Sequence, residues 1–104
     1  MKYATRKADA VWGAAIHAAG RCAVGVGCSG SLEAHHLIRR SVTATRHAVE
    51  NGILLCAFHH RYAKFSPHAG PKAFGQWLEK NMPDRWAWMQ EHKHERHKNE
   101  ITPN

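Results

Sequence analysis

Two histidine-rich segments, about 20 residues apart, hold the side chains of this chain that are best suited to chemistry. The first contains the doublet His35-His36, and the second ends in Cys56-x-x-His59-His60. An imidazole with its ordinary pKa near ~6.5 is largely neutral at pH 7 and can take a proton from water, while other imidazoles can hold a divalent ion against a phosphate. A base beside metal ligands predicts phosphodiester cleavage. The alternative is that a doublet arises by chance in a chain with 10 histidines.

The cysteines indicate a second, structural metal site. Cys22, Cys28 and Cys56 together with His59 make a Cys3His set, whose soft ligands suit tetrahedral zinc. Such a site contributes on the order of 10 kcal/mol to the folding of a small domain, and 104 residues provide only a modest core. The alternative is three apolar cysteines buried in that core. An odd cysteine number, with no hydrophobic leader, argues against a disulfide framework.

The charge of the chain favours nucleic acid as its partner. Lys plus Arg number 15 against 8 Asp plus Glu, which gives a net charge of +7, so the surface should attract polyanions. No apolar run is long enough to cross a bilayer, and reduced thiols suit the cytoplasm. Basic residues that flank the two histidine segments are the candidate DNA contacts, although each alone can be ordinary surface charge: Arg39, Arg40, Arg46, Arg61 and Lys64.

The elements around the histidines follow from periodicity and turn residues. An alanine-rich amphipathic helix is predicted over residues 7–19, followed by a glycine-rich loop over 21–31 in which Gly25 and Gly27 let the chain wrap around an ion. Leu32 to Ile38 is predicted to be a strand. The turn dipeptide Asn51-Gly52 leads into the β-prone run 53–55. These segments predict a ββ hairpin with a long connection.

Three helices are predicted after the hairpin. They span Ala57 to about Phe65, residues 72–81, and Asp84 to about Lys98. Aromatic residues at helical spacing in the second are assigned to the core instead of to base stacking. We therefore predict an α+β fold in a single domain, residues 1–104, with a core at about 20–66 between an N-terminal helix and C-terminal helices at about 71–98.

The order of these motifs resembles the HNH (ββα-metal) endonucleases, specifically the small phage and prophage members. Such members have a cysteine pair, Leu-x-x-His-His, an arginine, Asn-Gly and Leu-Cys-x-x-Cys-His. The resemblance extends from Ala8 to about Trp77. It is carried by Gly20-Arg21-Cys22, Cys28, Leu32-Glu33-Ala34-His35-His36-Leu37-Ile38-x-Arg40-Ser41, Arg46, Asn51-Gly52-Ile53-x-Leu55-Cys56-x-x-His59-His60 and Pro71-x-x-Phe74-x-x-Trp77.

The resemblance implies a role for each matching residue. His36 would be the general base, His35 and His60 would hold the catalytic ion, and Asn51 would tie the hairpin loop together and orient the base. As a plain turn former before Gly52, Asn51 would have a compatible structural role. His68, eight residues after His60, is a further candidate for the catalytic ion or the DNA.

Two departures from the family pattern concern the metals. His59 stands where most zinc-bearing members have a fourth cysteine, so the structural site would be Cys3His. His35 stands where aspartate is frequent, which should shift the catalytic ion from Mg2+ toward Mn2+, Ni2+, Co2+ or Zn2+.

The family implies DNA hydrolysis in the cytoplasm of a bacterial host, from a phage or prophage gene. Dimerisation would be one route to double-strand cleavage, and partners in phage DNA processing are compatible with the pattern. The alternative is a zinc-stapled DNA-binding module without catalysis, active in phage recombination or packaging. Such a module would need the Cys3His set and the basic surface, but not the three imidazoles of His35, His36 and His60.

Overall fold

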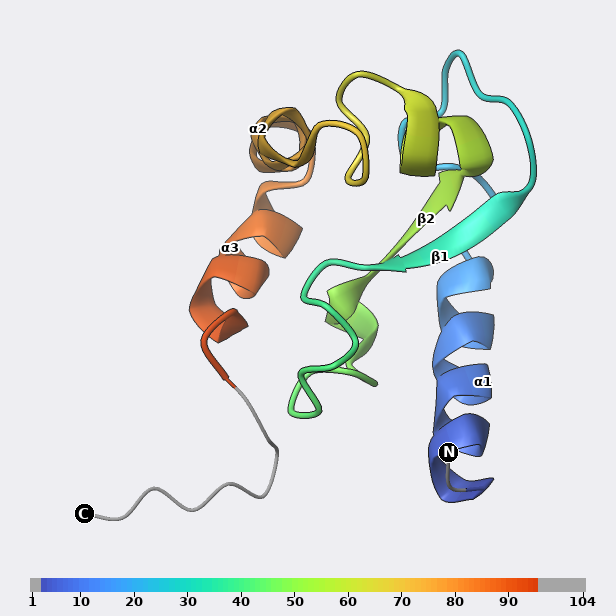
Figure 1. Cartoon of the computed structure of the whole chain (residues 1–104), viewed down its shortest axis with the longest axis vertical. Coiled ribbons are helices and arrows are strands. Elements are labelled where there is room, and N and C mark those ends of the chain that lie inside the picture. Colours follow the sequence, from blue (N-terminus) through green and yellow to red (C-terminus); the bar gives the residue numbers. More distant parts are fainter. Residues whose placement is uncertain (1–2, 96–104) are drawn as a thin grey trace.

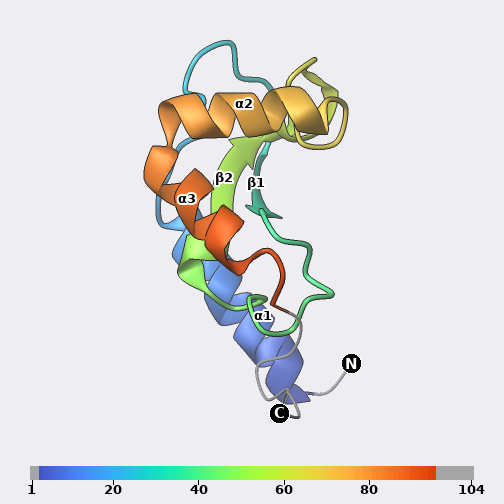
Figure 2. The ribbon, with the colours of Figure 1, turned by 90° about the vertical axis from the view of Figure 1, so that its left-hand side faces the viewer.

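The computed structural model describes residues 3–95 and shows an α+β arrangement built around a two-stranded antiparallel sheet (Figure 1). Helix α1 lies on one side of the hairpin, and α2 and α3 lie on the other. The turned view shows α2 running across the hairpin (Figure 2). In chain order the elements are α1 (Tyr3–His17), β1 (Leu32–His36), η1 (Val49–Asn51), β2 (Gly52–Cys56), η2 (Phe58–Tyr62), α2 (Pro71–Asn81) and α3 (Pro83–His92).

Strand β2 is the centre of the core because all five of its residues are buried. Side chains of a strand alternate between its two faces, so neighbours serve different clusters. Leu54 packs with Trp12 and Ile16 of α1. Ile53 and Leu55 pack on the other face, in a cluster that includes Phe74 and Leu78 of α2. Helices thus pack on both faces of the hairpin.

The pairing register places the histidine doublet at the end of the hairpin. Leu32 lies opposite Cys56, and His36 lies opposite Gly52. An added Cβ at Gly52 would lie 2.8 Å from Trp12 Cζ2 and closer still to Ile16. Gly52 has an extended backbone with φ −119°. Glycine is therefore required here by the close approach of α1, and not by the tight hairpin turn that Asn-Gly usually forms.

The predicted first helix and first strand exist with shifted bounds. Helix α1 runs over 3–17 instead of 7–19, and the chain turns at Gly20, whose φ is +76°. Strand β1 ends at His36 instead of Ile38. Leu37 N–H still donates to Asn51 O in the same register, but Asn51 N–H donates to Ala48 O instead of back to β1. The next residue, Ile38, donates its N–H to the Asn51 side chain, so the ladder ends here.

The predicted helix from Ala57 to about Phe65 is wrong in length and type. A single π-helical turn, η2, spans Phe58–Tyr62 and is closed by Ala63 N–H donating to Phe58 O. Helix α2 agrees with the prediction within one residue. Helix α3 ends at His92, and the rest of the predicted last helix, to Lys98, lies partly outside the described residues.

Among residues 3–95, no helix combines the length and apolar character that crossing a lipid bilayer demands.

Candidate functional site

Three cysteines and one histidine meet where the glycine-rich loop passes the end of the hairpin. The Nδ1 atom of His59 lies 3.6 Å from Cys22 Sγ, 3.7 Å from Cys28 Sγ and 3.2 Å from Cys56 Sγ. Bond lengths of about 2.3 Å to sulfur and about 2.05 Å to nitrogen place such atoms roughly 3.6 Å apart around a tetrahedral ion. All four ligand atoms lie within 4.8 Å of one another. The group can hold a metal ion such as zinc.

The loop wraps around this group as predicted from its glycines. Gly25 and Gly27 have φ of +78° and +69°, a region that side-chain-bearing residues rarely adopt. Gly30 also has positive φ, and a Cβ added there would lie 2.7 Å from Ala57 Cβ. These glycines let Cys22 and Cys28, which five residues separate in the sequence, approach the end of β2.

Electrostatics in the Cys3His group favour a bound cation. Desolvation and the neighbouring Cys22 and Cys56 raise the pKa of the Cys28 thiol to about 11. Burial raises the pKa of Cys56, but N–H donors of His59 and Ser29 and the other two thiols outweigh it, so that this pKa is lowered. Burial also lowers the pKa of His59, so its imidazole is neutral. Thiols so close together cannot all ionise without a positive charge among them.

A second cluster joins three imidazoles from three different elements. His60 Nε2 lies 3.1 Å from His35 Nδ1 and 3.1 Å from His68 Nε2. The turn η2 separates two adjacent residues, so that His59 belongs to the Cys3His group and His60 to this one. Nitrogens bound at about 2.05 Å to one ion lie roughly 3.0–3.4 Å apart, which agrees with both distances. His68, which the sequence offered only as a further candidate eight residues after His60, therefore belongs to the cluster.

Glu33 determines which nitrogen of His60 carries the proton. Its carboxylate Oε1 lies 2.7 Å from His60 Nδ1 and can only accept, so Nδ1–H donates. The pKa of Glu33 is lowered, chiefly by this bond. The Nε2 lone pair of His60 consequently faces two ring nitrogens. Since one lone pair cannot accept from both in good geometry, a cation between the rings explains the arrangement better than hydrogen bonding does.

His35 is neutral at physiological pH. Burial, and then the charges of His60, His68 and His36, lower its pKa to about 3. A histidine must be neutral to donate a lone pair to a metal, so the environment that repels a proton from His35 suits a ligand.

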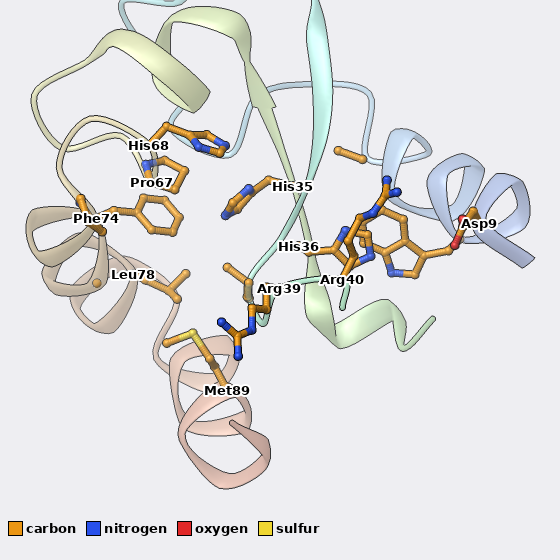
Figure 3. A pocket seen from close by; sticks show the side chains of 15 residues that line it. Asp9, His35, His36, Arg39, Arg40, Pro67, His68, Phe74, Leu78 and Met89 are labelled. Carbon is orange, nitrogen blue, oxygen red and sulfur yellow. The ribbon is translucent and has the colours of Figure 1, made fainter. Parts of the chain in front are cut away.

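His36 leaves the strand on the opposite side from His35, as the alternation of a strand requires (Figure 3). Its Nε2–H donates to the carbonyl of Arg46 at 2.9 Å, so Nδ1 keeps its lone pair. The Trp12 indole stacks on the imidazole, with ring centroids 3.8 Å apart and planes 9° from parallel. Burial lowers the pKa of His36 despite the bond to the carbonyl. A neutral, oriented imidazole with a free Nδ1 is what a general base needs.

Helix α1 also fixes the loop whose carbonyl His36 contacts. Asp9 forms a two-point ion pair with Arg46, at 2.9 Å to Nε and 2.7 Å to Nη2, and approaches His47 at 2.7 Å. Arg46 lowers the pKa of Asp9 well below its usual range. Trp12 Nε1–H donates to Ala48 O at 2.8 Å. Helix α1 therefore contacts both His36 and the loop whose carbonyl His36 bonds.

Asn51 ties the long connection of the hairpin together, as predicted. It is fully buried; its Oδ1 accepts from Ile38 N–H at 2.6 Å, and its Nδ2–H groups donate to Ile38 O at 2.9 Å and Thr45 O at 3.1 Å. None of these three bonds joins the Asn51 side chain to an imidazole of the cluster. Its role is to position the loop.

Both His35 and His36 line a cavity of about 660 Å³ that residues of the hairpin end and of helices α1, α2 and α3 enclose. His68 and Phe74 lie on the His35 side of the strand, while Asp9 and Arg40 lie on the His36 side (Figure 3). The predicted base and one predicted ligand thus share one opening although they point apart.

The predicted basic contacts divide into paired and unpaired groups. Arg46 is engaged by Asp9, which removes the possibility that it points freely at a phosphate. Arg61 forms an ion pair with Glu33 at 3.1 Å. Arg39, Arg40 and Lys64 are exposed and form no ion pair with another residue in 3–95.

Sequence reasoning missed Glu33, Asp9 and Trp12. Glu33 stands two residues before His35, and the period of a strand places such residues on one face. The sequence could therefore have predicted that Glu33 lies close to the imidazole cluster. Asp9 and Trp12 lie far from the histidine segments in sequence, and no local pattern connects them.

Comparison with models of protein families, with curated proteins and with solved structures finds no match to this chain. The chemistry of the site is therefore argued from its geometry: a Cys3His group and an imidazole cluster, each of which could hold a metal ion, and a neutral imidazole, His36, that lines the same cavity as His35.

Proposed function

We propose that this protein is a metal-dependent DNA endonuclease of the HNH kind, with a structural zinc in the Cys3His group. The observation that carries the proposal is that His36, neutral and held through its Nε2–H, lines the same cavity as His35 and His68, two of the three imidazoles of the cluster that His60 completes. A net charge of +7 supports a polyanionic substrate.

The three imidazoles suit a divalent transition metal better than Mg2+, which prefers oxygen ligands. Bound there, such an ion supplies positive charge that offsets the charge developing on phosphate oxygens during hydrolysis. Glu33 contributes by accepting the Nδ1–H of His60, because a carboxylate behind a ligating histidine fixes the ring and raises its basicity.

The chain's own residues perform the proton transfer. His36 Nδ1 removes a proton from a water molecule while the water oxygen forms a bond to phosphorus and the bond from phosphorus to the 3′-oxygen breaks. The 3′-oxygen leaves with the electron pair of that bond and takes a proton from solvent water. The resemblance to HNH enzymes implies 5′-phosphate and 3′-hydroxyl ends. The positive charge that His36 gains is stabilised because its Nε2–H already donates to the Arg46 carbonyl. Exposed Arg39 and Arg40, at the same cavity, bind the backbone phosphates.

Cleavage of supercoiled plasmid tests the proposal. The wild type should nick or cut the plasmid with Mn2+, Ni2+ or Co2+, and His36→Ala should lose roughly 10²-fold or more in rate, the range for a general base. His17→Ala is the matched control, since His17 is an exposed histidine at the end of α1. Zinc content and a thermal melt verify that each variant is folded. No cleavage by the wild type with any of these ions or Mg2+ would contradict the proposal.

The second candidate function is a zinc-stapled DNA-binding module without catalysis. The Cys3His geometry and the basic charge favour it equally. It gives no reason for Glu33 to orient His60 toward two further imidazoles, or for α1 to orient His36. The plasmid assay separates the two functions.

A further inference from the structure

The cavity beside the histidines has two chemically different walls. Apolar side chains of the hairpin end, α2 and α3 make one wall, chiefly Leu37, Phe74 and Met89, with the fully buried Leu78 behind them. The volume of the whole cavity, about 660 Å³, is in the range of small-molecule sites. A phosphate placed against that wall would lose its hydration without gaining a donor, so the apolar part of the cavity is not a phosphate site.

The other wall carries cationic side chains, and Asp9 of α1, which also lines the cavity, is paired with Arg46. Arg39 and Arg40 both line the cavity, are exposed, and have no acidic partner among residues 3–95. Figure 3 shows Arg39 reaching toward Met89, and Arg40 beside His36. A ligand that satisfies both walls has an anionic part for the arginines and a flat, largely apolar part for the space against Phe74 and Met89.

A nucleotide of the DNA strand has these two parts. We propose that this cavity binds a nucleobase that is out of its stack, so that the preferred substrate is DNA with an unpaired nucleotide next to the scissile phosphate. The inference rests on the proposed nuclease function, which places a phosphate at the histidines. A base within a continuous duplex cannot enter a concave pocket, because it is covered on both faces by its neighbours. An unpaired base enters at little cost and gains contact with the apolar wall.

Two glycines allow a matched test of the cavity. Gly75 of α2 lines the cavity, and an added Cβ there meets no atom within 4 Å. Gly13 of α1 is equally helical and equally open, and it does not line the cavity. Gly75→Phe should fill the cavity, and Gly13→Phe should not. Both replacements improve helix propensity, so both variants should fold.

Binding is measured by fluorescence anisotropy with the full zinc-loaded chain and no other divalent ion, and a gel verifies that the strands stay intact. Three labelled duplexes of one sequence are compared: fully paired, with one bulged thymidine, and with one bulged abasic nucleotide. The two bulged duplexes carry the same number of phosphates, so counterion release contributes equally to their binding.

We expect the thymidine bulge to bind roughly tenfold more tightly than the paired duplex, the range of stacking one base on a protein surface. Gly75→Phe should remove this preference, and Gly13→Phe should keep it. The abasic bulge should bind like the paired duplex. Equal binding of the thymidine and abasic bulges by the wild type would overturn the proposal, because bending alone would then explain the preference. A preference that survives Gly75→Phe would overturn it as well.

The two proposals fail separately. If the wild type cleaves plasmid but shows no preference for the thymidine bulge, the nuclease stands and the base site falls. If the preference follows the pattern above but no metal supports cleavage, the base site stands as a DNA-binding site and the nuclease falls.

Discussion

Replacing Asn51 by alanine should destabilise the protein strongly. Asn51 is fully buried and makes three hydrogen bonds, one accepted from Ile38 N–H and two donated to the carbonyls of Ile38 and Thr45. Alanine leaves the N–H and the carbonyl of Ile38 without partners, whereas the Thr45 carbonyl keeps the N–H of Ala48 at 3.1 Å. An unsatisfied buried group costs about 1–3 kcal/mol, and carbonyls tolerate it better than N–H groups, so we expect a total of about 3–5 kcal/mol.

That loss is large against the ~5–15 kcal/mol by which domains are usually stable. A change of 1 kcal/mol moves the Tm of a small domain by about 4–8 °C, so the zinc-loaded variant should melt about 15 °C or more below the wild type. Circular dichroism in a thermal ramp measures this. At a temperature where the variant is still folded, its cleavage rate should also fall, because the Arg46 carbonyl that orients His36 belongs to the same loop.

Ser66→Ala is the matched control. Ser66 is equally buried, but its side chain makes a single bond, accepted from Ala69 N–H at 3.0 Å. That variant should lose about 1 kcal/mol. If Asn51→Ala and Ser66→Ala melted at the same temperature, the loop would be held by contacts other than Asn51, and the positioning role assigned to Asn51 would be refuted.

Three other predictions concern α1 and the Cys3His group. Trp12→Phe keeps a ring over His36 and should lower the free energy of unfolding by about 1 kcal/mol, because the N–H bond to Ala48 is lost. Trp12→Leu should change kcat more than KM in steady-state cleavage, with a lower kcat. An unchanged kcat in Trp12→Leu would disprove the positioning role. Asp9→Asn should cost about 1 kcal/mol at pH 7. Because Arg46 holds the pKa of Asp9 below its ordinary 3.8, urea titrations should show this difference shrinking as the pH falls below about 4, and a gap that stays constant down to pH 2 would contradict the pairing. Cys56→Ser should lower stability by several kcal/mol and abolish the sensitivity of the Tm to chelators; a Tm equal to that of the wild type with and without chelator would argue against a structural ion.

The residues of both clusters that could hold a metal ion were predictable because ligand types and short spacings are local. Cys56-x-x-His59 joins a strand end to a turn, and the hairpin brings His35 toward His60 as its period requires. The α+β class and the two strands followed from hydrophobic patterns of the same short range.

Contacts between distant segments were not predictable. Trp12 reaches His36 and Asp9 reaches Arg46 across long separations in sequence, and both depend on where α1 packs on β2. That packing also explains why residue 52 is glycine: α1 approaches the backbone there too closely for a side chain, whereas the sequence alone suggests a turn former. The π-helical turn differs from an α-helix in that the N–H of Ala63 donates to the carbonyl five residues back, at Phe58, and no local pattern distinguishes this from a bond four residues back.

Titration of the metal-free chain with Co2+, followed by its optical spectrum and by plasmid cleavage in parallel, tests most directly whether two distinct ions serve two purposes. We expect a first equivalent with thiolate-to-cobalt charge-transfer absorption and no cleavage, and a second equivalent without that absorption that switches cleavage on. His60→Ala should lose only the second event. Cleavage that is complete after the first equivalent, or that persists unchanged in His60→Ala, would contradict the account.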